Sequence, residues 1–176
     1  HVLKTLDRTH DPERVAQAVH WARSAGFDNI SLDLIYGTPG ESLSDWETSL
    51  QQAIDLGPNH ISAYALIVEP NTALARKISR GEIEPPDDDL SADKYELAEK
   101  MLSDAGFSWY ELSNWRLDES AGCAHNELYW RSDDWWGFGP GAHSHVSGLR
   151  WWNSKNPRGY KTVGHEVLDE PTKQLE

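Results

Sequence analysis

The fold is decided by the segment NISLDLIY (residues 29–36), which runs directly into the breaker GTPG (residues 37–40). Apolar and polar side chains alternate along this segment, as they do on a half-buried β-strand. One face carries Ile30, Leu32, Leu34 and Tyr36, and the other carries Ser31, Asp33 and Ile35. We therefore predict a strand whose carboxyl end opens into a glycine-rich loop, the edge where α/β folds place their sites.

Helix and strand signals alternate on both sides of this strand. Helices are predicted at residues 12–25, 43–56 and 89–105, and further strands at 60–67 and 107–113, with a polar connection before the third helix. The alternation predicts an α/β fold in which parallel strands are joined by helices. Three strands are too few for a closed barrel of eight, so the fold class is the later half of a partial barrel.

We expect two regions along the chain. Residues 1–113 contain the helix–strand repeats, and residues 114–176 change to loops and short aromatic strands rich in Trp and Gly. Seven of the nine tryptophans lie between Trp109 and Trp152. The chain starts at His1 and opens on a helix, so we expect a piece of a longer protein whose preceding strand pairs with residues 29–36.

Composition narrows the function classes. Acidic residues number 29 and basic ones 16, which gives a net charge of −13 and disfavours a nucleic-acid partner. No apolar run approaches the roughly 20 residues of a transmembrane helix, and no signal segment precedes the first helix. A single cysteine excludes a disulfide framework and a multi-thiolate zinc site within the chain. These features predict a cytoplasmic protein without a transmembrane segment.

Two positions could carry chemistry. Asp33 interrupts an apolar strand, where a carboxylate costs several kcal/mol unless it is paired or bound to a polar ligand. It either contacts a small molecule or serves as a structural carboxylate. The second position is His125, in the segment CAHNELYW (residues 123–130). Its imidazole either coordinates heme iron with neighbouring rings against the porphyrin, or is hydrogen-bonded in an aromatic cluster.

Several motifs together resemble one family. They are RTH (8–10), LDLIYGTPG (32–40), EPNT (69–72), YELSN (110–114) and HNELYW (125–130), in this order. The chain thereby resembles the radical SAM family related to oxygen-independent coproporphyrinogen III oxidase. The last motif is similar to the HNxxYW signature of its HemW-type heme chaperones.

The resemblance implies a partial (β/α)6 barrel that holds S-adenosylmethionine and a [4Fe–4S] cluster. It implies that Arg8 and Asp33 contact S-adenosylmethionine and that the strand end near Ile67 lies against its adenine. In the HNxxYW motif it implies a heme-binding site made of His125, Asn126, Tyr129 and Trp130, with His125 as the tentative ligand of the heme iron.

The chain also departs from the family pattern. The three-cysteine loop that binds the cluster is absent, because Cys123 is the only cysteine. We therefore expect the cluster ligands, the segment that holds the methionine group and a C-terminal helical domain outside these residues.

Three functions remain open at this point. The resemblance favours a heme-binding chaperone that transfers heme to acceptor proteins in the cytoplasm or at the inner membrane face. The alternative is an oxygen-independent coproporphyrinogen III oxidase (dehydrogenase) of porphyrin biosynthesis, so enzymatic activity is undecided. The third is an interaction domain whose tryptophans form a partner surface.

Overall fold

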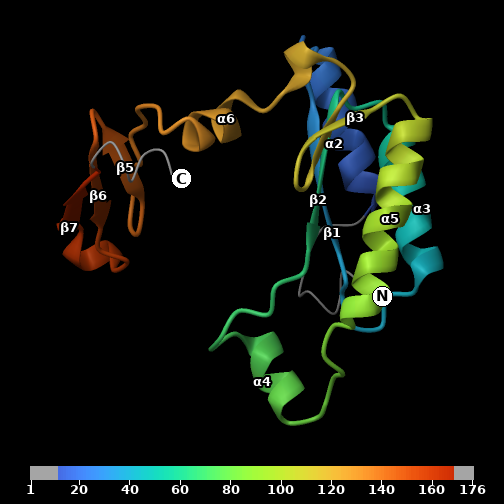
Figure 1. Cartoon of the computed structure of the whole chain (residues 1–176), viewed down its shortest axis with the longest axis horizontal. Helices are drawn as coiled ribbons and strands as arrows, with labels where there is room; N and C mark the ends of the chain where they lie inside the picture. The colour runs from blue at the N-terminus through green and yellow to red at the C-terminus, as the bar shows by residue number, and fades with distance from the viewer. Residues whose placement is uncertain (1–11, 169–176) are drawn as a thin grey trace. The chain divides into compact units, whose positions relative to one another are not determined.

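In the computed structural model, which describes residues 12–168, the chain divides between Gly122 and Cys123 into two units (Figure 1). The first unit alternates helices and strands as the sequence predicts. Its elements are α2 (Pro12–Ser24), β1 (Ser31–Tyr36), α3 (Leu43–Asp55), β2 (His60–Ala65), α4 (Ala73–Ser79), α5 (Asp88–Asp104), β3 (Ser108–Glu111), β4 (Asn114–Arg116) and the 3₁₀ turn η1 (Glu119–Ala121).

The first unit contains a four-stranded mixed sheet in the order β1-β2-β4-β3. Strands β1 and β2 are parallel, as predicted, but β4 pairs antiparallel with both β2 and β3. The prediction of an all-parallel sheet is therefore wrong beyond β2, and among the described strands no barrel closes. The segment 107–113 is not one strand, because β3 ends at Glu111 and the chain reverses through Leu112 and Ser113 into β4. This reversal places β4, rather than β3, beside β2.

One face of this sheet packs against helices and forms the core. The core contains Tyr36, Trp46, Leu50, Ala53, Ile61, Ala63, Ala98, Leu102, Phe107 and Trp115, with Leu32 and Leu34 packed against it. The predicted apolar face of β1 is therefore confirmed, and Ser31 and Asp33 lie on the exposed face. Burial of these side chains is the main source of stability in the unit.

Helix α3 begins where the sequence predicts. Ser42 caps it, since its hydroxyl accepts from the backbone N–H of Asp45 and the Asp45 carboxylate accepts from the backbone N–H of Ser42. Leu43 is 39% exposed, because it stands in the first turn, ahead of the packed stripe that starts at Trp46.

The polar connection expected after β2 contains a short helix instead. Thr72 caps α4 by accepting from the backbone N–H of Ala75. No residue of α4 is buried, so the apolar periodicity that reveals a packed helix is missing from its sequence.

The second unit is described by itself. It contains α6 (Ala124–Trp130), β5 (His143–Val146), β6 (Leu149–Asn153), the 3₁₀ turn η2 (Pro157–Gly159) and β7 (Thr162–Val167). The strands form an antiparallel sheet in the order β5-β6-β7, which confirms the predicted short aromatic strands. The motif HNELYW was expected in a loop, and this is wrong, because it lies on α6. An ion pair between Glu127 and Arg131, one helical turn apart, helps to stabilise this helix.

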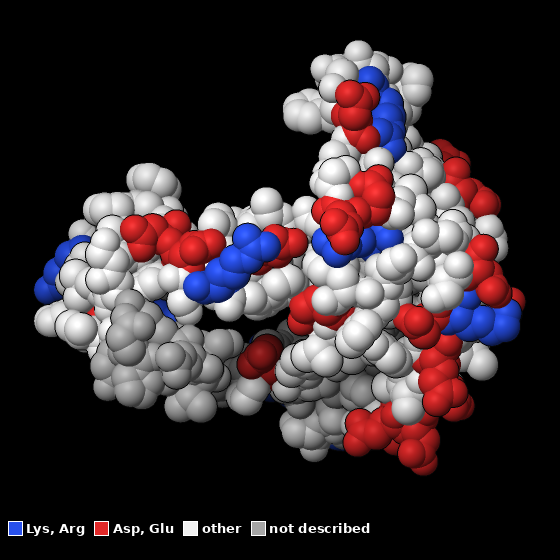
Figure 2. All heavy atoms as spheres, turned by 45° about the horizontal axis from the view of Figure 1, so that its top comes forward, with Lys and Arg blue, Asp and Glu red and all other residues white. Residues whose placement is uncertain are grey.

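Within residues 12–168 no helix has both the length and the apolar character needed to cross a membrane. Acidic side chains outnumber basic ones on the face shown in Figure 2, and Lys and Arg are scattered there without a continuous basic patch. This distribution follows the net charge of −13.

Candidate functional site

Asp33 lies at the end of a polar row that crosses the first sheet. Its Cα partner on β2 is Ser62, whose own partner on β4 is Asn114. The Ser62 hydroxyl donates to Asn114 Oδ1 (2.9 Å), and Asn114 Nδ2 donates to the carboxylate of Glu111. Ser62 and Asn114 are buried, whereas Asp33 is exposed. The exposed carboxylate can accept hydrogen bonds from hydroxyl or amine groups of a small molecule.

The loop after β1 is fixed by a buried ion pair that the sequence analysis missed. Lys94 on α5 donates to the Glu41 carboxylate (2.8 Å) and to its backbone carbonyl (2.7 Å). The same carboxylate accepts from the backbone N–H of Gly37 (2.8 Å). One feature of the sequence could have revealed this pair. Lys94 lies one helical turn from both Leu90 and Ala98, on the apolar stripe of α5, and a charge in an apolar environment is stable only with a partner.

Two other residues, Ile67 and Arg8, are predicted to contact S-adenosylmethionine. Ile67 lies beyond the end of β2 and is 74% exposed. Arg8 lies outside the described residues. Of the three residues, Asp33 and Ile67 therefore have a described position, and both belong to the first unit.

A second polar group that the sequence analysis missed lies where β1 and β2 begin. His60 is 2% exposed, and its ring nitrogens are hydrogen-bonded to the Ser31 hydroxyl (2.8 Å) and the Tyr110 hydroxyl (2.7 Å). Burial lowers the pKa of His60, which the charge of Asp33 opposes and that of Arg116 reinforces. Because sites of parallel strands lie at their carboxyl ends, this group is a structural element of the sheet.

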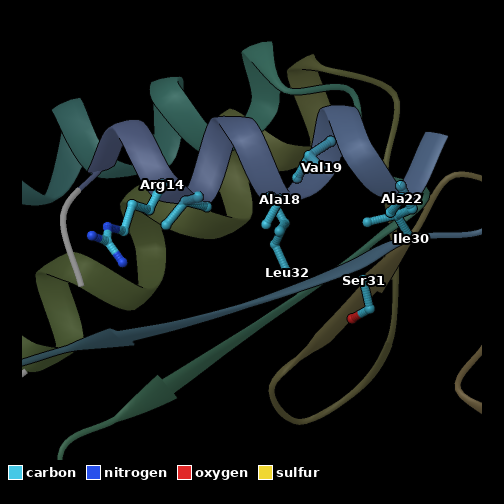
Figure 3. Close-up of a pocket in the computed structure, with 8 residues that line it drawn as sticks. Arg14, Ala18, Val19, Ala22, Ile30, Ser31 and Leu32 are labelled. Atoms are coloured by element: carbon cyan, nitrogen blue, oxygen red, sulfur yellow. The ribbon is translucent and has the colours of Figure 1, made fainter. Parts of the chain in front are cut away.

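An open, mainly apolar pocket of about 370 Å³ lies between α2 and β1, and the helix covers the strand there (Figure 3). Arg14 and Ser31 supply the polar groups of the lining. The rest of the lining is apolar and consists of Val15, Ala18, Val19, Ala22, Ile30 and Leu32. Among the predicted site residues that the structure describes, none lines it.

The second unit places two rings of the predicted heme motif, His125 and Tyr129, in a row with Trp135. His125 is exposed on α6, and its ring meets the Tyr129 ring edge to face, with centroids 4.8 Å apart. Tyr129 in turn contacts Trp135 at 4.8 Å. Trp130 is 41% exposed, and Asn126 is half-buried on the same helix. An exposed imidazole supported by aromatic rings can approach the iron of a flat porphyrin.

The described residues offer no metal site made of several side chains. No group of three or more His, Cys, Asp or Glu side chains among residues 12–168 could hold a metal ion. A [4Fe–4S] cluster is held by several thiolates, and the whole chain has only Cys123, which is partly buried. The residues of this chain therefore do not supply the thiolates that such a cluster needs.

Comparison with solved structures defines the class of fold. The chain is similar to Escherichia coli coproporphyrinogen III oxidase (HemN), described as a radical SAM enzyme, with a TM-score of 0.80 and 19% identity. The alignment covers 99% of this chain and 45% of the HemN chain. The α/β fold of this chain therefore matches part of the HemN structure. No protein-family model matches the chain.

Comparison with curated proteins identifies the particular relatives. The chain is 52% identical to the heme chaperone HemW of Mycobacterium tuberculosis H37Rv over 162 residues, or 92% of its length. It is 38% identical to the heme chaperone HemW of Escherichia coli K12 over 163 residues, which cover 90% of this chain. The chain spans about two fifths of these relatives, 41% and 42%. Over the shared segment the chain is similar in sequence to these HemW proteins.

Proposed function

We propose that this chain is the part of a cytoplasmic heme-binding chaperone that contacts heme and passes it to acceptor proteins, membrane-associated ones among them. The observation that carries the proposal is the exposed imidazole of His125, supported by the Tyr129 ring on a helix with the HNxxYW spacing. The homology to HemW supports the same reading.

The chemistry proposed for the motif is reversible ligation of a cargo. A neutral imidazole nitrogen of His125 donates its lone pair to the heme iron, and the rings of Tyr129 and Trp130 offer apolar surface to the porphyrin. His125, Tyr129 and Trp130 are all exposed, so a bound heme would remain accessible to an acceptor. Asn126 completes the motif on the same helix.

We also propose that the first unit contacts S-adenosylmethionine. The exposed carboxylate of Asp33 suits the ribose hydroxyls, the backbone near Ile67 would lie against the adenine, and Arg8 would add a cation. The polar row behind Asp33 supports its role, because buried Ser62 and Asn114 hold the adjacent strands in register.

The test is a titration of the full chain with hemin, followed at the Soret band. We expect one saturable equivalent for the unaltered chain. His125→Ala should weaken binding on the order of tenfold or more, or shift the band, because a ligand of the iron is lost. His20→Ala is the matched control, since this exposed imidazole lies on α2 of the first unit and is not part of the HNELYW motif. Equal binding by His125→Ala and His20→Ala would overturn the assignment of His125.

The coproporphyrinogen III oxidase alternative has one observation in its favour, the likeness of the fold to HemN. At 19% identity this likeness concerns the fold alone. Decarboxylation of coproporphyrinogen III by the complete protein, reconstituted with iron and sulfide, would reverse the ranking.

A further inference from the structure

The second unit carries an exposed imidazole besides His125, on strand β5. His143 on β5 is exposed, and its ring stacks on the indole of Trp152 on β6, with centroids 5.7 Å apart and planes 23° apart. His143 and Trp152 are direct cross-strand partners, so the stack follows from the register of the sheet.

Gly164 makes room for this stack on the neighbouring strand. Gly164 is the cross-strand partner of Trp152 on β7, and a Cβ atom at Gly164 would overlap the indole ring. The indole therefore lies across the backbone of β7 where a side chain would otherwise stand. The ring of His143 is held on this indole and exposed to solvent.

The stack lies on the same face of the sheet as the row of rings that begins at His125. His143 and His145 are two residues apart on β5, so their side chains share a face. Trp135 bridges to His145 in the antiparallel register, and their rings are 4.9 Å apart. Because Trp135 also contacts Tyr129, the rings of the heme motif continue onto this face.

A cation lies on the same face, next to the Trp135 ring. Arg150 is the cross-strand partner of His145, so it shares the face, and its guanidinium lies 5.9 Å from the Trp135 ring centroid. It also pairs with Glu166 at 3.4 Å. The opposite face carries a different aromatic pair, Trp136 with Trp151.

We propose that the His143–Trp152 stack is a second contact for the porphyrin, so that the ligand bound at His125 extends over this face of the β5-β6-β7 sheet. The inference rests on the proposed heme function. A stacked, exposed imidazole offers a flat surface to a macrocycle with no loss of side-chain freedom, because the pair is already ordered.

The test is a hemin titration of the full chain and two matched pairs of variants. His143→Ala is compared with His165→Ala, because His165 is also exposed and stands on the opposite face, paired with Trp151. Trp152→Ala is compared with Trp151→Ala for the same reason. Circular dichroism of each variant shows whether the sheet is retained.

We expect His143→Ala to weaken hemin binding about two- to tenfold, the usual value of one aromatic contact, and His165→Ala to leave it unchanged. If the unaltered chain and His143→Ala bind equally while His125→Ala is impaired, the second contact is refuted and the proposed function stands. If the unaltered chain binds no hemin, both are refuted.

Discussion

Replacing Lys94 with methionine tests how the loop after β1 is held. The Lys94 and Glu41 side chains are 1% and 2% exposed, and the carboxylate binds both the ammonium group and the backbone N–H of Gly37. Lys94→Met keeps the apolar stem but leaves the Glu41 carboxylate buried without its cation. Breaking a buried ion pair on one side costs about 3–5 kcal/mol, so we expect the unfolding free energy to fall by that amount.

The assay is urea unfolding of the full chain, followed by tryptophan fluorescence. Trp46 reports on the site directly, because its indole N–H donates to the Lys94 backbone carbonyl (2.9 Å). The midpoint should fall while the slope stays constant, which marks a loss of stability without a change in the denatured state. Lys100→Met is the control on the same helix. Its pair with Asp104 is exposed to solvent, and its midpoint should barely move.

A second substitution separates the buried charge from simple loss of packing. In Lys94→Met with Glu41→Gln the amide oxygen can still accept from the Gly37 N–H, and no charge remains buried. We expect the double variant to regain about 2 kcal/mol relative to Lys94→Met. The reasoning is refuted if Lys94→Met loses less than about 1 kcal/mol, or if the double variant is no more stable than the single one.

Two further predictions concern other parts of the chain. Because burial lowers the pKa of His60, the unfolded state binds a proton more readily than the folded state, so stability should be full above the ordinary pKa of 6.5 and fall as the pH drops from there to the lowered value. Urea unfolding between pH 7.5 and pH 5 should show this fall in the unfolding free energy, and His60→Asn should reduce it. If the unfolding free energy of His60→Asn falls with pH as steeply as that of the unaltered chain, His60 is not the cause. Gly164→Ala should destabilise the second unit by roughly 1–3 kcal/mol, because the new Cβ overlaps the Trp152 ring. Gly159→Ala, which meets no atom within 4 Å, is the control in thermal melts, and equal melting temperatures would disprove the overlap.

The local elements were predictable because their signals are local. The capping box at Ser42, the alternation around Asp33 and the breaker after Tyr36 act within a few residues, and the structure confirms α3 and β1. Helix α4 was not predicted because none of its residues is buried. Helix α6 was not predicted because a helix of seven residues is too short to show a periodic apolar face.

The candidate site was predictable only in part. The family motifs identified Asp33 and His125, and both are exposed. The sequence did not show the partners of Lys94 and His143, because Glu41 and Trp152 lie 53 and 9 positions away along the chain.

The sequence by itself determined the type of each packed element, the apolar face of β1 and the motif that relates the chain to HemW, because propensity, alternation and spacing are written in adjacent residues. Only the tertiary structure decided that β4 pairs with β2, that Lys94 neutralises a buried carboxylate and that His143 stacks on Trp152. Strand neighbours and buried partners are chosen by packing and by desolvation of polar groups. Those free energies depend on which distant segments meet in the folded chain.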